Sequence, residues 1–204
     1  MNQTNISVES ASAVINRQIH IDREVAHCQN IDEIVSSLSE RYEMCTLLNT
    51  KVSLVFAHLS NFDELGLSLE AVDDFMSILA RSMLKLTRSA DVVIKYGQNH
   101  LIVLLVACDQ FNAAKVCQRF KDAIHRTGFL SHKFAKDFEF DFGIAEDVPN
   151  YNHTIDKLVE EAYGALNIAN SCGSGAVIRR ADMEGGRSSL PREHFVEGEP
   201  HNGR

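Results

Sequence analysis

The sequence predicts an α/β fold in which helices flank a central sheet. Segments with apolar residues at helical spacing alternate along the chain with short apolar runs that are typical of buried strands. Such alternation favours helices packed on the faces of a sheet. The chain of 204 residues is long enough for one domain with a sizeable core. It contains no internal repeat.

The first half of the chain combines a polar extension with three predicted elements. Residues 1–30 are polar and only weakly helical, and we assign them to an N-terminal extension. Residues 31–48 form a predicted helix, because apolar side chains recur on one of its faces. Residues 52–59 have the continuous apolar character of a buried strand. A second helix is expected over residues 68–88, with Ser68 as its N-cap.

The second half continues the alternation up to a polar tail. Residues 91–106 are predicted to form two strands joined by a tight turn, and Asp109 or Asn112 opens the next helix. Phe138 to Ala145 alternates as a strand does, and residues 155–170 form a last long helix. A short strand follows at 176–178. We assign residues 31–180 to one domain and 181–204 to a flexible C-terminal tail, because Gly, Pro, Ser and charged residues dominate after residue 184.

Composition excludes several classes of function. Hydrophobic residues make up 45% and charged residues 24% of the chain, as in a soluble globular protein, and no apolar run approaches the ~18–20 residues of a membrane span. The N-terminus lacks the basic and apolar segments of a secretion signal, so we expect a cytoplasmic protein. The five cysteines are scattered and are expected to be reduced. A formal charge of −8 argues against binding to nucleic acid or anionic membranes.

The segment from Arg88 to Leu101 carries the most information. It has a helix end, a strand, the turn Gly97-Gln98-Asn99-His100 and the start of a second strand. This pattern resembles the signature hairpin of the GGDEF family, the bacterial diguanylate cyclases. In that family a Gly-Gly-Asp/Glu-Glu-Phe turn grips GTP and its metal. An Arg-x-x-Asp pair five residues upstream holds the product, cyclic di-GMP, at an inhibitory site.

The resemblance extends over roughly residues 33–179. Three further segments follow the family's motifs in the right order, namely residues 35–41, 142–145 and 161–170. The resemblance implies the nucleotidyl-cyclase-like fold of that family, a central five-stranded mixed sheet flanked by helices. It also implies a bacterial signalling protein.

The departures from the family pattern fall on its catalytic positions. His58 stands where the family has its first metal-binding Asp, and Asn99 stands at the acidic ligand in the turn. Magnesium prefers carboxylate oxygens, and neither an imidazole nor an amide supplies their charge. The resemblance therefore implies an inactive protein with no catalytic residue, no metal and no cofactor. Its degenerate former active site consists of His58, Gly97, Gln98, Asn99, His100 and Leu101.

The Arg-x-x-Asp pair survives as Arg88 and Asp91, and the family register places a second arginine at Arg119. The arginine fork can pair with a phosphate or with guanine O6 and N7, and a carboxylate can accept from guanine N–H groups. The resemblance thus implies a cyclic di-GMP site. Singly, each residue has an ordinary alternative, such as a helix C-terminal charge for Arg88. All three are expected at the surface, where substitution leaves the stability of the free protein nearly unchanged.

The leading functional hypothesis is an inactive receptor that binds cyclic di-GMP and signals through protein–protein contact. A partner protein would bind residues 1–30 or the C-terminal tail, and a stacked pair of ligands would either bridge two copies of the chain or lock two elements of one copy. Two alternatives stay open: a scaffold or adaptor that binds proteins and no nucleotide, and an allosteric GTP-binding module.

Overall fold

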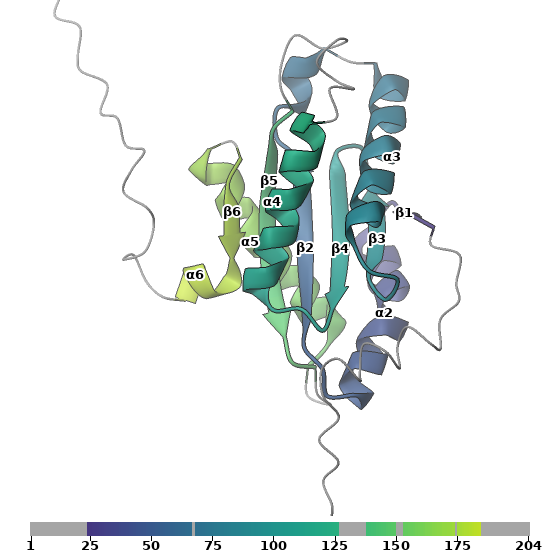
Figure 1. Ribbon diagram of the computed structural model, residues 1–204, viewed down its shortest axis with the longest axis vertical. Coiled ribbons are helices and arrows are strands. Elements are labelled where there is room, and N and C mark those ends of the chain that lie inside the picture. Colours follow the sequence, from purple (N-terminus) through teal and green to yellow (C-terminus); the bar gives the residue numbers. More distant parts are fainter. Residues whose placement is uncertain (1–23, 67, 127–137, 150–152, 174, 185–204) are drawn as a thin grey trace, which may run out of the picture.

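The computed structural model describes residues 24–66, 68–126, 138–149, 153–173 and 175–184, which form a six-stranded sheet covered by helices (Figure 1). The strands lie in the order β1-β3-β4-β2-β5-β6. Along the chain the elements are β1 (Ala26–Cys28), α2 (Ile31–Leu47), β2 (Val52–Leu59), the 3-10 helix η1 (Phe62–Leu65), α3 (Leu69–Leu86), β3 (Val92–Tyr96), β4 (His100–Val106), α4 (Gln110–Arg126), β5 (Phe140–Asp147), α5 (Ile155–Cys172), β6 (Val177–Arg179) and α6 (Arg180–Glu184).

The sheet is mixed, as the sequence predicts. The central strand β2 is antiparallel to β4 and β5, whereas β1 and β6 pair in parallel with β3 and β5. The sheet has six strands rather than the expected five, because Ala26–Cys28 pairs with Ile94–Tyr96 at one edge. These three residues lie in the predicted weakly helical extension, so that prediction is wrong for them. A three-residue edge strand is too short to show a periodic pattern, and residues 1–23 lie outside the described part of the chain.

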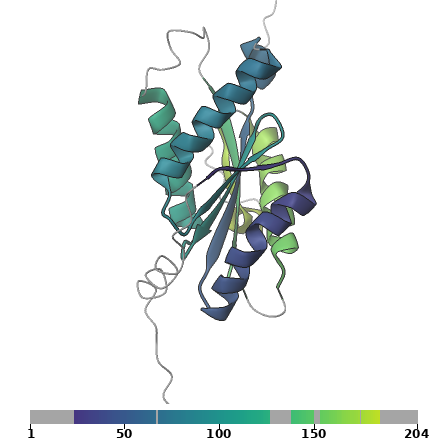
Figure 2. The ribbon, with the colours of Figure 1, turned by 90° about the vertical axis from the view of Figure 1, so that its right-hand side faces the viewer.

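Two helices cover each face of the sheet (Figure 2). Alternate residues of β2 point to opposite faces: Val55 and Leu59 pack in the cluster that contains α3 and α4, and Leu54 and Phe56 pack in the cluster that contains α2 and α5. Because both faces are covered, β2 reads as a continuous apolar run rather than as an alternating one.

Local capping bonds fix where the helices begin. The Ser68 hydroxyl accepts from the Ala71 N–H at 3.3 Å, which confirms Ser68 as the N-cap of α3. Of the two residues expected to open α4, the structure selects Asp109, whose carboxylate accepts from the Asn112 N–H at 2.8 Å. Each bond satisfies an N–H that the first turn of a helix cannot pair internally.

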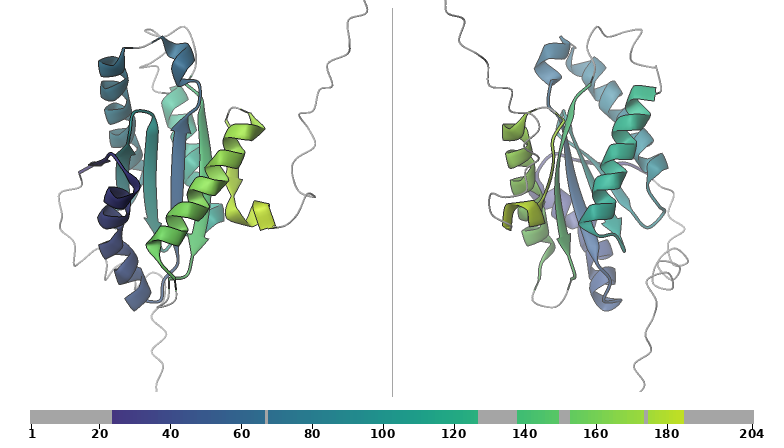
Figure 3. Two further views of the ribbon diagram at one scale, coloured as in Figure 1. Left: turned by 180° about the vertical axis from the view of Figure 1, so that it is seen from behind. Right: turned by 60° about the vertical axis from the view of Figure 1, so that its left-hand side comes forward.

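The last described element, α6, lies beside β6 (Figure 3). Its Asp182 accepts from the Arg179 guanidinium at 2.6 Å. Residues 181–184 of the predicted tail belong to this helix, and residues 185–204 lie outside the described residues. Among the described helices, none combines the length and apolarity that a membrane-spanning helix needs.

Candidate functional site

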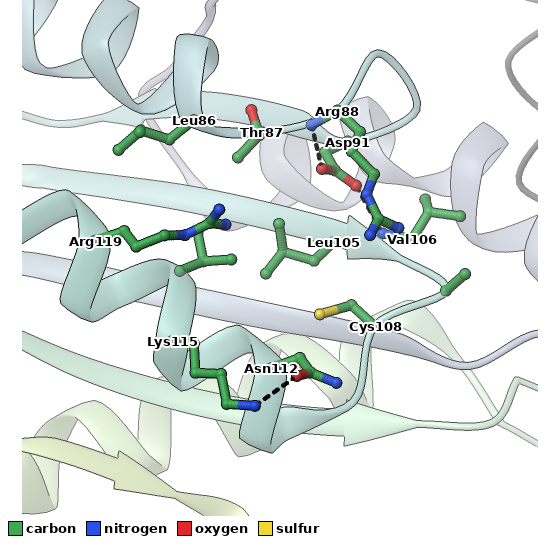
Figure 4. Close-up of a pocket in the computed structure, with 12 residues that line it drawn as sticks. Leu86, Thr87, Arg88, Asp91, Leu105, Val106, Cys108, Asn112, Lys115 and Arg119 are labelled. Carbon is green, nitrogen blue, oxygen red and sulfur yellow. Dashed lines mark hydrogen bonds between the residues drawn. The ribbon is translucent and has the colours of Figure 1, made fainter.

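A cavity of about 450 Å³ lies between the corner that joins α3 to β3, the end of β4 and the first turns of α4 (Figure 4). All three residues predicted to bind a ligand line it, although they come from two separate parts of the chain. Its lining residues are Leu86, Thr87, Arg88, Asp91, Leu105, Val106, Ala107, Cys108, Asn112, Lys115, Val116 and Arg119. The Arg88 guanidinium reaches into it from the corner, and Arg119 reaches into it from α4.

Asp91 holds the corner of this cavity in place. Its Oδ2 accepts from the Arg88 N–H at 2.7 Å, and its Oδ1 accepts from the Val106 N–H at 3.0 Å. The residue is only 8% exposed, so the expectation that Asp91 is a surface residue is wrong. The carboxylate turns inward because two backbone N–H groups at the end of the hairpin need an acceptor. Arg88 and Arg119 are exposed, as predicted.

The charged residues that line this cavity are predominantly cationic, against the net charge of −8 of the chain. In the described part of the cavity wall, Arg88, Lys115 and Arg119 face a single acidic residue, Asp91. Burial raises the pKa of the Cys108 thiol to about 11, and nearby Asp91 and Asp109 add to the shift, so the thiol is neutral and adds no negative charge. Such a cavity favours an anionic ligand with polar edges.

Sequence reasoning missed Asn112, Lys115 and Cys108 as lining residues. A signal for Lys115 was present, because it precedes Arg119 by four residues and therefore lies on the same face of α4. Cys108 carries no such signal, since it follows a buried strand and reads as a core thiol.

The turn between β3 and β4 lies at the opposite end of this hairpin, and the structure confirms its predicted antiparallel form. Tyr96 pairs with His100, and Gly97 adopts a φ of 56°, a left-handed conformation that favours glycine. The Asn99 carbonyl accepts from the Leu59 N–H at 2.9 Å, which brings the turn against the end of β2. Leu101 is fully buried in the core below the turn.

His58, Asn99 and Asn170 bond to one another beside this turn. Asn99 Nδ2 donates to His58 Nε2 at 3.1 Å, and His58 Nδ1 lies 3.1 Å from Asn170 Oδ1. An imidazole that accepts at Nε2 carries its proton on Nδ1, so His58 donates to Asn170. The His58 and His100 rings stack with centroids 4.6 Å apart. The amide–imidazole–amide chain thus joins the turn, β2 and α5.

This cluster does not match the ligands that magnesium prefers. His100 is neutral near pH 7, because burial, together with the charge of His58, lowers its pKa to about 4. Asp141, which pairs with His58 across the sheet, accepts instead from the Ala176 N–H at 2.9 Å. Magnesium binds mainly anionic oxygen ligands in octahedral geometry. Within the described residues, no group of three or more His, Cys, Asp or Glu side chains is placed to hold a metal ion.

Residues 25–175 match the family described as diguanylate cyclase, GGDEF domain. This match covers most of the chain, so the chain belongs to the GGDEF family, as its hairpin suggested. A search of curated protein sequences finds no match.

Solved structures agree on the fold. The GGDEF domain of PA1120 (TpbB or YfiN) from Pseudomonas aeruginosa is 16% identical, with a TM-score of 0.61 over 81% of this chain and 99% of that one. The GGDEF domain of DgcB from Caulobacter crescentus, solved in complex with c-di-GMP, is 12% identical, with a TM-score of 0.59. That match covers 79% of this chain and 97% of the DgcB chain. The P. aeruginosa diguanylate cyclase SiaD, solved with its activator SiaC, is 18% identical, with a TM-score of 0.61. That match covers 72% of this chain and 57% of the SiaD chain.

Proposed function

We propose that this chain is a catalytically inactive GGDEF-domain receptor that binds cyclic di-GMP in the cavity lined by Arg88, Asp91 and Arg119. The observation that carries the proposal is the convergence of these three side chains on one cavity of about 450 Å³. That volume lies within the ~300–1,000 Å³ typical of small-molecule sites. The protein would then signal by contact with another protein.

The chemistry of the cavity suits this ligand. Cyclic di-GMP carries two phosphodiesters and two guanines, so it offers both negative charge and flat polar edges. The guanidinium groups of Arg88 and Arg119 can donate two parallel hydrogen bonds to a phosphate or to guanine O6 and N7. Two oxygens of Asp91 already accept from backbone N–H groups, yet a carboxylate offers about four acceptor sites, so it can still accept from a guanine N–H.

The proposal of inactivity rests on the cluster at the hairpin turn. Phosphoryl transfer depends on metal ions that neutralise the charge developing on the phosphates. At the positions that the family uses for this purpose, His58 and Asn99 bond to each other, and neither supplies a carboxylate oxygen. Gln98 stands at the position of the second glycine, where a side chain obstructs the approach of a nucleotide to the backbone.

The proposed output is contact with a protein partner. Among relatives of similar fold, DgcB has been solved with c-di-GMP and SiaD with its activator SiaC, so the fold accommodates a ligand or a partner protein. We propose that residues 1–30 or the C-terminal tail contribute the contact for this chain. Most of these residues lie outside the described part of the structure.

Isothermal titration calorimetry on the purified chain tests the proposal. Cyclic di-GMP is expected to bind with a dissociation constant between roughly nanomolar and low micromolar, which corresponds to about −8 to −12 kcal/mol. Cyclic di-AMP, which has the same charge but different base edges, is the matched control, and GTP tests the GTP-binding alternative. If cyclic di-GMP in large excess gives neither binding heat nor a rise in melting temperature, the receptor function is wrong and the scaffold function replaces it.

A further inference from the structure

We infer that Lys115 is a third cationic contact for the ligand of this cavity, and that Asn112 and Asp109 position it. The inference rests on the proposed function, which assigns the ligand but gives Lys115 no role. Lys115 lines the cavity together with Arg88 and Arg119. It lies one helical turn before Arg119 on α4, so both side chains extend from the same face of the helix (Figure 4).

A chain of hydrogen bonds leads from the start of α4 to the Lys115 ammonium group. Asp109 accepts from Asn112 twice: Oδ1 accepts from the backbone N–H at 2.8 Å, and Oδ2 accepts from the side-chain Nδ2 at 3.0 Å. This arrangement fixes the orientation of the Asn112 amide. Its Oδ1 therefore faces Lys115, whose Nζ donates to it at 3.2 Å.

Because the Asn112 amide that bonds to Lys115 is neutral, it does not reduce the positive charge of the cavity. A carboxylate bonded directly to Lys115 would cancel its charge, whereas the Asn112 amide restrains the long side chain and leaves the positive charge uncompensated. The ammonium group has three N–H donors, so two remain for a ligand after the bond to Asn112. Because a lysine side chain loses considerable rotamer freedom on binding, restraint in the free protein reduces that loss.

The cations of the cavity lie on two walls. Arg88 belongs to the corner between α3 and β3, whereas Lys115 and Arg119 belong to α4 (Figure 4). A ligand with two phosphodiesters can engage both walls at once, one charge at each. Bound in this way, it ties the end of α3 to the start of α4, and Lys115 and Arg119 share the contact at the α4 wall.

The competing interpretation is an exposed lysine that bonds within its own helix and contacts no ligand. Lys115→Met removes the charge and keeps the length of the side chain. Lys85→Met is the matched control, because Lys85 is an exposed lysine in the last turn of α3 and does not line the cavity. By calorimetry, we expect Lys115→Met to raise the dissociation constant for cyclic di-GMP about tenfold, and Lys85→Met to change it by less than about twofold.

The positioning role of Asn112 needs a separate measurement. Asn112→Ala is expected to weaken binding about threefold in the parent and to have no further effect in the Lys115→Met background, because it acts only through Lys115. Equal effects of Asn112→Ala in both backgrounds would overturn the positioning role. If the parent binds cyclic di-GMP and Lys115→Met behaves like Lys85→Met, the role of Lys115 is wrong while the proposed function stands. If the parent does not bind cyclic di-GMP, both the proposed function and the role of Lys115 are wrong.

Discussion

The carboxylate of Asp91 joins the backbone of Arg88 to that of Val106, with acceptor distances of 2.7 and 3.0 Å. It thereby fixes the corner after α3 against the last residue of β4. Arg88 extends into the cavity from this corner, so the position of its guanidinium depends on a residue that is itself almost fully buried. Fold stability and ligand binding are coupled at Asp91.

Replacement of Asp91 should therefore destabilise the free protein. Asp91→Ala leaves the buried Val106 N–H and the half-buried Arg88 N–H without this acceptor, and a buried group left unpaired costs about 1–3 kcal/mol. We expect the free energy of unfolding to fall by about 2 kcal/mol or more in urea titrations. Asp74→Ala, an exposed position on α3, is the control and should change it by less than about 0.5 kcal/mol. Similar values for the two variants would contradict the role of Asp91.

Replacement of Arg88 should separate binding from stability. Arg88 is exposed, so Arg88→Ala should leave the melting temperature of the free protein nearly unchanged. The variant loses a bidentate donor and should bind cyclic di-GMP at least about tenfold more weakly. Its ligand-induced rise in melting temperature should shrink accordingly. Arg119→Ala should show a smaller loss, since Lys115 shares its wall.

Arg81→Ala provides the matched control for these arginine variants. Arg81 is exposed on α3, bonds to the Ser77 carbonyl in its own helix and does not line the cavity. Its replacement should leave the affinity for cyclic di-GMP unchanged. If Arg88→Ala binds as tightly as Arg81→Ala, Arg88 is no part of the ligand site.

The sequence predicts the elements that extend over many residues and misses those that depend on a single contact. The long helices and the hairpin follow from apolar periodicity and from Gly97, which suits a tight turn. The edge strand Ala26–Cys28 shows no pattern in three residues, because it exists only through its pairing with β3. The resemblance to the GGDEF family, in contrast, was sufficient to select Arg88, Asp91 and Arg119, which line one cavity in the structure.

The chemistry of individual side chains was less predictable. The sequence placed Asp91 at the start of the hairpin and at the surface, but whether its carboxylate faces solvent or the backbone of β4 depends on a bond to a residue 15 positions away. The contact between His58 and Asn170 spans 112 residues, so no local pattern could reveal it. The sequence could show that the expected acidic ligands are replaced, but not that their replacements bond to one another.

Gly143 shows how closely α5 packs on the sheet. A Cβ atom at this position would lie 2.1 Å from the Leu166 backbone N and 2.3 Å from the Ala162 carbonyl oxygen. Because backbone atoms cannot move aside cheaply, we expect Gly143→Ala to lower the free energy of unfolding by at least about 3 kcal/mol or to prevent folding. Soluble yield and urea unfolding are the measurements.

Gly164→Ala is the matched control on the helix itself. A Cβ at Gly164 meets no atom within 4 Å, and alanine is favoured over glycine inside a helix by about 1 kcal/mol. This variant should be slightly more stable than the parent. If Gly143→Ala unfolds at the same urea concentration as Gly164→Ala, α5 does not lie against β5 as described.

The cluster at the hairpin turn predicts the outcome of a cyclase assay. The chain incubated with GTP and Mg²⁺ or Mn²⁺ should form no cyclic di-GMP, because His58 and Asn99 cannot provide anionic metal ligands. Product analysis by chromatography is the measurement, with an active GGDEF domain as the positive control. Product above a sample without protein would overturn the proposed inactivity, whether or not the cavity binds cyclic di-GMP.

His100 predicts a dependence of stability on pH. Its pKa is lowered from an ordinary value of 6.5 to about 4, first by burial and then by the charge of His58. The folded state therefore binds this proton less readily than the unfolded state does. At neutral pH neither state is protonated, and the shift has no effect. As the pH falls below 6.5, protonation stabilises the unfolded chain, and the resulting loss of stability grows until the pH reaches about 4.

His100→Phe isolates this contribution, because it keeps an aromatic ring beside His58 and removes the titrating group. The stability of the parent relative to the variant should be constant above pH 7. It should then fall by about 1.2 kcal/mol between pH 6 and pH 5. Urea unfolding of both proteins at pH 7.5, 6 and 5 measures the difference. The raised pKa of Asp141 stabilises the folded state as the pH falls, and the comparison cancels this contribution because both proteins contain Asp141. A constant difference across these pH values would show that the folded protein protonates His100 as readily as the unfolded chain does.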